Sequence, residues 1–371
     1  MRGASFALIA IGFFLQISRA SAEETWDFEE LGSHYTSIRK MAMGGAYVAL
    51  ADDHSTVFLN PAGLANLPNP RVHLLPLLLE VSDDPAKIYS SDDRSSVSNV
   101  SLDSLSVLAG KNIYGRSQVA PLFTIPYFGF GFLIDEQIAL YNKNKALPLT
   151  YLGIQSTRVL QASFAYSFGR GRLSRNRPDL KVGLGVKIAW RRGGLRKLTQ
   201  TEVLSLVSGA TLTAGELVGS MKEGYGFDVG GLYTIPIHKG LQFNIGAAYI
   251  NVGDVSFGSG DDMPASMEDN AAIGVAAKYD TGFMNLNVSY EYSDVFESYD
   301  WRKKNHFGIE IGLPLITLYG GINQIYFTYG AEVNLLIFKF KAARYTQELS
   351  SFVGMEPNTR YQFFTDISFE L

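Results

Sequence analysis

Four consecutive residues, Asp52, Asp53, His54 and Ser55, carry the side-chain types of a nucleophile, a general base and an orienting carboxylate. A hydrolytic triad needs these groups to converge in space beside donors for an oxyanion. Neighbours in sequence do not converge in this way, and no oxyanion motif accompanies them. We therefore expect a hydrogen-bonded polar turn at this position, and we expect that the protein is not an enzyme.

Metal and cofactor chemistry has equally little support in the residue pattern. The five histidines are scattered and lack the spacing of metal ligands; they are His34, His54, His73, His238 and His306. The chain has no cysteine, which excludes a disulfide framework and thiolate chemistry. Gly44 and Gly45 lack the Lys-Ser/Thr of a phosphate-binding loop and follow no strand. We expect neither a metal nor a cofactor.

One basic cluster stands out in a mildly acidic chain, whose formal net charge is −4. Its members are Arg170, Arg172, Arg175, Arg177 and Lys181. Acidity argues against a nucleic-acid partner, so we interpret the cluster as a solvated periplasmic turn that touches anionic lipid headgroups.

Residues 1–22 have the features of a secretory signal: a basic start, an apolar run over residues 4–17, and small residues at Ala20 and Ala22. The run is shorter than the roughly 18 residues of a spanning helix, which favours cleavage after Ala22 over a retained anchor. No later apolar run reaches spanning length. Yet the chain contains 24 Phe, 20 Tyr and 37 Gly, and only 18% of its residues are charged. This composition favours a membrane β-barrel.

From Arg71 onward, apolar and polar or small residues alternate with a period of two, as in strands that have one apolar face. In residues 180–190, for example, valine, leucine, isoleucine and tryptophan alternate with lysine, glycine and alanine. About fourteen strands are expected, near residues 71–80, 126–134, 137–143, 158–168, 180–190, 225–235, 240–251, 270–280, 283–293, 303–313, 315–321, 325–334, 336–347 and 360–371.

The connections between these segments are alternately short and long, as in outer-membrane barrels with short periplasmic turns and long external loops. Asp135 and Glu136 are expected to form one of the short turns. The last strand alternates up to Leu371, which suits closure against the first strand. The alternative is a soluble two-sheet protein, but the sequence lacks the polar outer faces that such a protein needs. We therefore predict an all-β fold: an antiparallel transmembrane outer-membrane β-barrel over residues 71–371.

Two long connections contain short helical patterns, after Thr199 and around residues 102–110. These apolar helices could pack on each other and cap the barrel. They could equally form a groove that first captures a hydrophobic ligand. Both interpretations stay open.

The stretch 41–64, MAMGGAYVALADDHSTVFLNPAGL, precedes the strands and does not alternate. Gly44 and Gly45 permit close backbone approach, and Asn60-Pro61-Ala62 forms a tight turn. A compact, weakly amphipathic segment of this kind suits the interior of the barrel. We therefore expect residues 23–70 to form an N-terminal luminal hatch.

With this turn placed ahead of such a barrel, the chain resembles the FadL/TodX family of outer-membrane transporters for hydrophobic molecules. It is similar in particular to their PorV-like and spirochaetal (UPF0164) relatives, in which a MGGAYVALADD…NPAGLA stretch also precedes the first strand. The resemblance covers residues 39–65 and is diffuse elsewhere.

The resemblance implies a monomeric barrel in the cell outer membrane that takes up long-chain fatty acids or other hydrophobic small molecules passively. Its hatch or gating residues would be Gly44, Gly45, Asn60, Pro61 and Ala62. The family releases ligand through an inward kink in a wall strand, and the candidate kink here contains Pro126, Gly129 and Gly131, which weaken strand pairing. The ligand-binding residues remain unassigned. The alternative function is that of a PorV-like adaptor that binds protein partners in secretion or surface assembly.

Overall fold

The computed structural model describes residues 31, 35–84, 112–142, 150–169, 177–198, 219–258, 263–335 and 337–371. The expected signal segment 1–22 lies outside these residues. So do nearly all of both expected loop helices and most of the basic cluster around residue 172.

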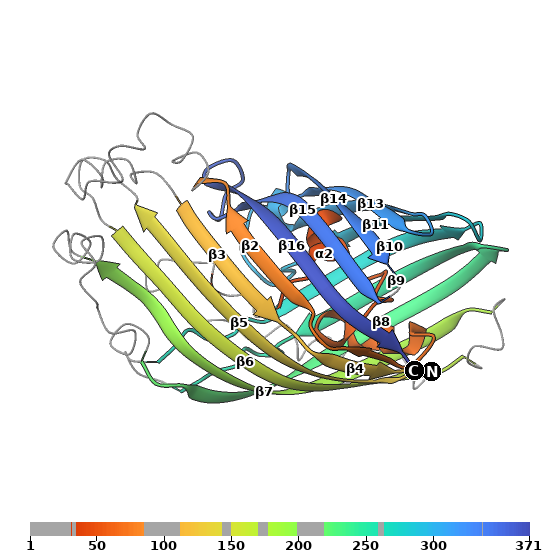
Figure 1. Ribbon diagram of the computed structural model, residues 1–371, viewed down its shortest axis with the longest axis horizontal. Coiled ribbons are helices and arrows are strands. Elements are labelled where there is room, and N and C mark those ends of the chain that lie inside the picture. Colours follow the sequence, from red (N-terminus) through yellow and green to blue (C-terminus); the bar gives the residue numbers. More distant parts are fainter. Residues whose placement is uncertain are drawn as a thin grey trace, which may run out of the picture.

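The described strands form one closed antiparallel barrel (Figure 1). They are β1 (Arg71–His73), β2 (Leu77–Ser82), β3 (Asn112–Val119), β4 (Leu122–Ile125), β5 (Phe128–Asn142), β6 (Thr150–Ser167), β7 (Asp179–Leu198), β8 (Lys222–His238), β9 (Leu241–Ile250), β10 (Asn270–Asp280), β11 (Asn285–Tyr292), β12 (Asn305–Gly312), β13 (Ile316–Asn323), β14 (Tyr326–Leu335), β15 (Phe338–Glu348) and β16 (Pro357–Glu370). β1 continues into β2 and β3 continues into β4, so the wall has fourteen strands, as predicted.

Closure uses the last strand as expected, because β16 pairs with both β1 and β2. Connections at the end of the barrel where Leu371 lies are mostly short, such as 126–127, 239–240 and 313–315. Those at the other end are mostly long, such as 293–304 and 349–356. We call these the short-turn end and the long-loop end. Within the described ranges, no helix combines the length and apolarity needed to cross a membrane.

The period of two corresponds to an apolar outer face and a polar or small inner face. On β7, Val182, Leu184 and Val186 are exposed on the outside, whereas Lys181, Gly183 and Lys187 are buried towards the lumen. A band of outward apolar side chains surrounds the barrel, which is the surface that a lipid bilayer requires.

Two of the predicted strand boundaries were wrong. Segments 126–134 and 137–143 are one strand, β5, and the expected Asp135–Glu136 turn does not exist. Asp135 faces the lumen, where Arg116 donates a hydrogen bond to it, and Glu136 faces outward and accepts one from Ser156. The strand 112–125 was missed, because small and polar residues such as Gly115 and Ser117 occupy its outer face and remove the contrast between faces.

Residues 35–70, which we call the luminal segment, lie inside the barrel (Figure 1). The segment contains α2 (Ile38–Ala42), α3 (Thr56–Leu59) and a 3-10 helix, η2 (Pro61–Asn66). α2 packs on β13, β14 and β15, and η2 packs on β6, β7 and β8. One further 3-10 helix, η4 (Trp301–Lys304), belongs to a connection at the long-loop end.

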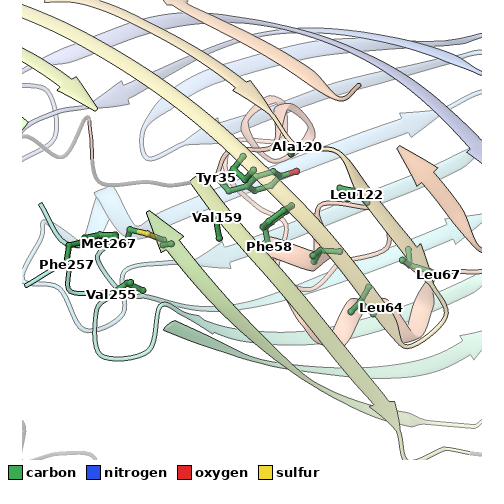
Figure 2. Packing of buried hydrophobic residues seen from close by; sticks show 13 residues of the cluster. Tyr35, Phe58, Leu64, Leu67, Ala120, Leu122, Val159, Val255, Phe257 and Met267 are labelled. Carbon is green, nitrogen blue, oxygen red and sulfur yellow. The ribbon is translucent and has the colours of Figure 1, made fainter. Parts of the chain in front are cut away.

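A buried apolar cluster joins the luminal segment to one side of the wall (Figure 2). Tyr35, Phe58 and Leu64 come from the segment, and Leu122 and Val159 come from the wall. The remaining members are Val57, Leu67, Ala120, Leu133, Ala189, Val255, Phe257 and Met267. We call the part of the lumen that this cluster fills the apolar sector. A second buried apolar cluster joins Ile38 and Leu50 of the segment to Phe364 on β16.

Candidate functional site: the lumen and its internal segment

The glycines of the luminal segment allow its backbone to lie directly on the wall. Gly44 and Gly45 both have positive φ, +68° and +92°, which disfavours other residues. A Cβ on Gly44 would lie 2.5 Å from the carbonyl oxygen of Phe307. Gly308 on β12 likewise leaves space for Met43. Paired glycines on the segment and the wall therefore let two backbones approach without intervening side chains.

The Asn60-Pro61-Ala62 turn is completely buried in the lumen. The Asn60 side chain accepts a hydrogen bond from the Ala62 amide (3.2 Å) and donates one to the Val48 carbonyl (2.8 Å), so it closes the turn and ties two parts of the segment together. The turn rests on bare backbone of the wall, since a Cβ on Gly230 would lie 3.0 Å from Pro61 Cδ. The first turn of η2 is thereby wedged against β7 and β8.

An ionic network fixes the centre of the segment. Arg39 donates to both oxygens of Glu310 on β12, at 2.6 and 3.1 Å, and also to Asp52 at 2.6 Å. Lys278 on β10 forms a second ion pair with Asp52. Burial alone would raise the pKa of the Asp52 carboxyl, but the positive charges of Arg39 and Lys278 outweigh burial and lower this pKa to about 2. Asp52 is therefore a charged structural anchor.

Inward polar side chains hold the segment's backbone groups from several strands. Glu291 on β11 accepts hydrogen bonds from the Tyr47 and Val48 amides, each 2.7 Å long. The carbonyl of Val57 accepts from Gln161 on β6, and that of Ala49 accepts from Asn244 on β9. Buried backbone groups need such partners. The inner face thus supplies the hydrogen bonds that water would otherwise provide.

The segment leaves a cavity at each end of the lumen. The cavity toward the long-loop end has a volume of about 280 Å³, and its lining includes Tyr35, Lys40, Phe58, Arg116 and Glu291. The cavity toward the short-turn end also measures about 280 Å³. Its lining includes His54, Arg71, His73, Glu332 and Lys341. Polar and apolar groups both line each cavity, and the luminal segment contributes to both.

His54 connects the segment to the first wall strand. Its ring packs on that of His73 with centroids 4.4 Å apart, and His73 Nδ1 lies 2.6 Å from an Asp366 oxygen on β16. The other members of the tetrad Asp52–Ser55 have structural partners as well: the Tyr47 hydroxyl donates to Asp53, and the Tyr35 hydroxyl donates to Ser55. These residues form the hydrogen-bonded turn that the sequence suggested. No group of metal-ligating side chains occurs among the described residues.

The wall is interrupted in two neighbouring strands, next to His73. Regular strand pairing stops at residues 74–76, between β1 and β2, and at residues 120–121, between β3 and β4. Single hydrogen bonds remain there, from the Leu74 amide to the Ile367 carbonyl and from the Phe132 amide to the Pro121 carbonyl. Pro76 and Pro121 stand in these breaks, and proline cannot donate to a strand ladder. Of the residues proposed for a kink, Pro126 lies in the β4–β5 turn, and the ladder of β5 is continuous through Gly129 and Gly131.

Gly129 and Gly131 have a different structural role. A Cβ on Gly129 would lie 2.6 Å from Val57 Cγ2, and one on Gly131 would lie 2.9 Å from Phe58 Cζ. These glycines make room for α3 of the luminal segment.

The anchoring wall residues Glu291, Glu310 and His73 were not singled out in the sequence. The sequence pattern does place each of these three residues on the inward face of a wall strand. The alternation marks the face of a residue but not its partner.

No family model matches this sequence, and neither does any curated protein. Among solved structures, the chain is similar to the toluene transporter TodX of P. putida, with 12% identity and a TM-score of 0.47, covering 91% of this chain and 99% of that one. It is similar to the toluene transporter TbuX of Ralstonia pickettii, with 12% identity, a TM-score of 0.48 and the same coverage. A third similar structure is the CymD monoaromatic hydrocarbon channel, with 12% identity and a TM-score of 0.44, covering 89% and 96%.

Proposed function

We propose that this protein is a monomeric outer-membrane channel through which hydrophobic small molecules, long-chain fatty acids among them, cross passively. Residues 1–22 would be the secretory signal, residues 23–70 the hatch, and residues 71–371 the barrel, with the long-loop end outside the cell. The cargo is of the same broad class as that named for the toluene transporters above.

One observation carries the proposal: the chain's own luminal segment lies across the bore of a barrel with an apolar outer face, with a cavity on either side of it. A solute that enters from the long-loop end meets the segment before it reaches the other end. Transport therefore requires the segment to shift, and a ligand that binds the shifted form better would favour that form.

The exit would be the interruption beside β1 and β4. Leu74 and Leu75 are exposed on the outer surface there, whereas Ala120 belongs to the apolar cluster of the lumen. Apolar side chains thus lie on both sides of this part of the wall, and the two prolines remove ladder hydrogen bonds that would otherwise have to break. An apolar molecule would leave sideways into the lipid.

Locking the luminal segment to the wall tests the proposal. A Cβ on Gly129 would lie 2.6 Å from Val57 Cγ2, the position that a cysteine sulfur would take, and the chain has no native cysteine, so the V57C/G129C variant offers a unique disulfide between the segment and the wall. Reconstituted in liposomes, the reduced variant should admit a radiolabelled long-chain fatty acid, and the oxidised variant should not. Equal uptake by both forms would refute a moving hatch.

A second function has one feature in its favour. Phe296, Trp301, Phe352 and Met355 are exposed on two connections at the long-loop end. These connections are joined by a hydrogen bond from the Asp300 amide to the Ser351 carbonyl (3.1 Å). Large exposed aromatic groups are typical of protein-binding surfaces, so an adaptor role would use this patch. A stoichiometric protein that co-purifies with the wild type but not with W301A/F352A would favour that role.

A further inference from the structure

The connection between β9 and β10 folds back into the mouth of the barrel. Its described arms are residues 251–258 and 263–269, which we call the inserted loop. The Val255 and Met267 backbones pair through two hydrogen bonds, of 2.9 and 3.0 Å, and bring the arms together. Val255, Phe257 and Met267 are almost fully buried, although they belong to a connection at the open end.

These three side chains occupy the apolar sector of the lumen. They belong to the same buried cluster as Tyr35 and Phe58 of the luminal segment, and in Figure 2 Val159 of the wall lies between the two groups. Tyr35 and Phe58 also line the cavity toward the long-loop end. The inserted loop therefore fills apolar space that adjoins a cavity open to that end.

The wall is shaped to receive this loop. On β8, Gly224 and Gly226 present bare backbone to the lumen, and a Cβ on Gly224 would lie 2.9 Å from Val255 Cγ1 and 2.7 Å from the Ser256 carbonyl oxygen. A Cβ on Gly226 would clash with Val255 as well. At both positions, an added side chain would collide with that of Val255 in its present place.

Arg191 holds the inserted loop, but without a carboxylate. Its side chain is fully buried and donates to the carbonyls of Ala265 (3.1 Å) and Ser266 (3.0 Å). Its guanidinium lies 5.5 Å from the centroid of the Phe257 ring, and Nη2 has no hydrogen-bond partner among the described residues. These are charge-assisted hydrogen bonds to neutral carbonyls, and water can take the place of the carbonyls when the loop leaves the lumen.

The base of the loop is held more firmly. Asp228 accepts a hydrogen bond from the Asn251 amide (2.8 Å) and pairs with Lys187 at 2.7 Å. Lys187 also donates to the Asn251 side chain. Where it leaves the wall, the loop is thus hydrogen-bonded to a buried ion pair between β7 and β8. Further along it is held by apolar contacts and by the hydrogen bonds from Arg191, so its apolar arms can leave the lumen while the base stays in place.

We infer that the space filled by Val255, Phe257 and Met267 is a binding site for an apolar molecule, which the inserted loop occupies as an internal substitute. The ligand would carry a ring or a chain about as bulky as the Phe257 side chain. One apolar group would replace another against Val159 and Ala189, and a ligand ring would take the position of Phe257 beside Arg191. The inference rests on the proposed function for its ligand class.

Removing the Phe257 side chain tests whether the space that it fills can bind an apolar molecule. Apolar cavities stay dry and bind apolar molecules such as benzene, so F257A in detergent should bind the fluorescent apolar probe N-phenyl-1-naphthylamine about tenfold more tightly than the wild type. F257W should bind it less tightly than the wild type. The matched control is F352A, at an exposed loop position, which should not change probe binding. Resistance of the barrel to SDS before heating checks that each variant is folded.

A disulfide gives an independent measurement without removing a core side chain. In the G226C/V255C variant, oxidation should fix the loop in the lumen and weaken probe binding, and reduction should restore it. If F257A and F352A bind the probe equally and oxidation has no effect, the inference is wrong. Fatty-acid uptake by liposomes that contain the wild-type protein distinguishes the proposed transport function from the inferred binding site. If uptake fails but F257A binds the probe much more tightly than the wild type, the proposed function is wrong and the binding site is supported. If uptake is normal but F257A does not change probe binding, the proposed function is supported and the binding site is wrong.

Discussion

Arg39 and Glu310 form a two-point ion pair between the luminal segment and the wall, with hydrogen bonds of 2.6 and 3.1 Å between residues 271 positions apart in sequence. Both side chains are nine-tenths or more buried. The pair connects the start of the luminal segment to β12, and Asp52 extends it to a second point of the segment. It is the central ionic contact between the segment and the wall.

Breaking this pair should loosen the segment. In E310A the Arg39 guanidinium loses its bidentate partner, and removing one member of a buried pair typically costs about 3–5 kcal/mol. We expect E310A to increase the open probability of the reconstituted barrel in planar-bilayer recordings and to lower the urea midpoint of unfolding.

The double variant R39A/E310A should lose less free energy of unfolding than the two single variants lose together, because it leaves neither charge of the pair without its partner. The exposed pair Arg71–Glu370 is the matched control, and R71A should change the free energy of unfolding by no more than about 1 kcal/mol. Additive single and double effects would show that the two residues act independently.

Two adjacent glycines offer a sharper test of the backbone contact between η2 and the wall. Gly230 faces the lumen, where a Cβ would lie 3.0 Å from Pro61 Cδ, whereas nothing lies within 4 Å of a Cβ on Gly231. We expect G230A to destabilise the folded protein by about 1–3 kcal/mol, because overpacking forces the segment to move. G231A should be neutral in the same urea titration. Equal stability of both variants would place η2 away from this wall.

The wall could be predicted from sequence because each strand separates two different environments. Residues such as Leu184 face outward and Gly183 faces inward on a strict period of two, which reports the face directly. The prediction failed where this contrast is absent. In β3 the outer residues Gly115 and Ser117 resemble inner ones, and in β5 adjacent acids suggested a turn although Asp135 and Glu136 face opposite sides.

The candidate site was less predictable, because long-range closure creates it. The Asn60 turn and the glycine pair indicated an internal segment, since their backbone requirements are local. Nothing local pairs Arg39 with Glu310, or His54 with His73. The inserted loop was also missed, because the apolar residues around Val255 carry no period that distinguishes a loop folded into the lumen from one that is not.

Replacing Asn60 should change transport more than it changes the stability of the barrel wall. N60A removes a buried acceptor from the Ala62 amide and a buried donor to the Val48 carbonyl, and unsatisfied buried groups cost about 1–3 kcal/mol. We expect N60A/P61A to alter fatty-acid uptake by liposomes while the barrel remains folded in SDS without heating. Asn69, whose side chain is exposed at the short-turn end and donates to Glu370, is the control. Unchanged uptake in N60A/P61A would assign the turn a purely structural role.

Acid should release the luminal segment through His54. Burial, reinforced by neighbouring His73, lowers the pKa of His54 from its ordinary 6.5 to about 3. Once the segment leaves the wall, His54 regains its ordinary pKa and binds a proton throughout this interval, whereas the docked form does not. The docked state is therefore favoured above about pH 6.5 and progressively loses stability as the pH falls toward 3. Open probability should rise over that range in planar-bilayer recordings.

His54 lies near Asp53, His73, Lys341 and Asp366. The variant H54Q keeps a polar side chain but cannot take up the proton, so its opening should depend less on pH between 6.5 and 4 than that of the wild type. H238Q is the control, since His238 is exposed at the short-turn end. An H54Q protein whose opening follows the same pH curve as the wild type would show that another group controls acid release of the segment.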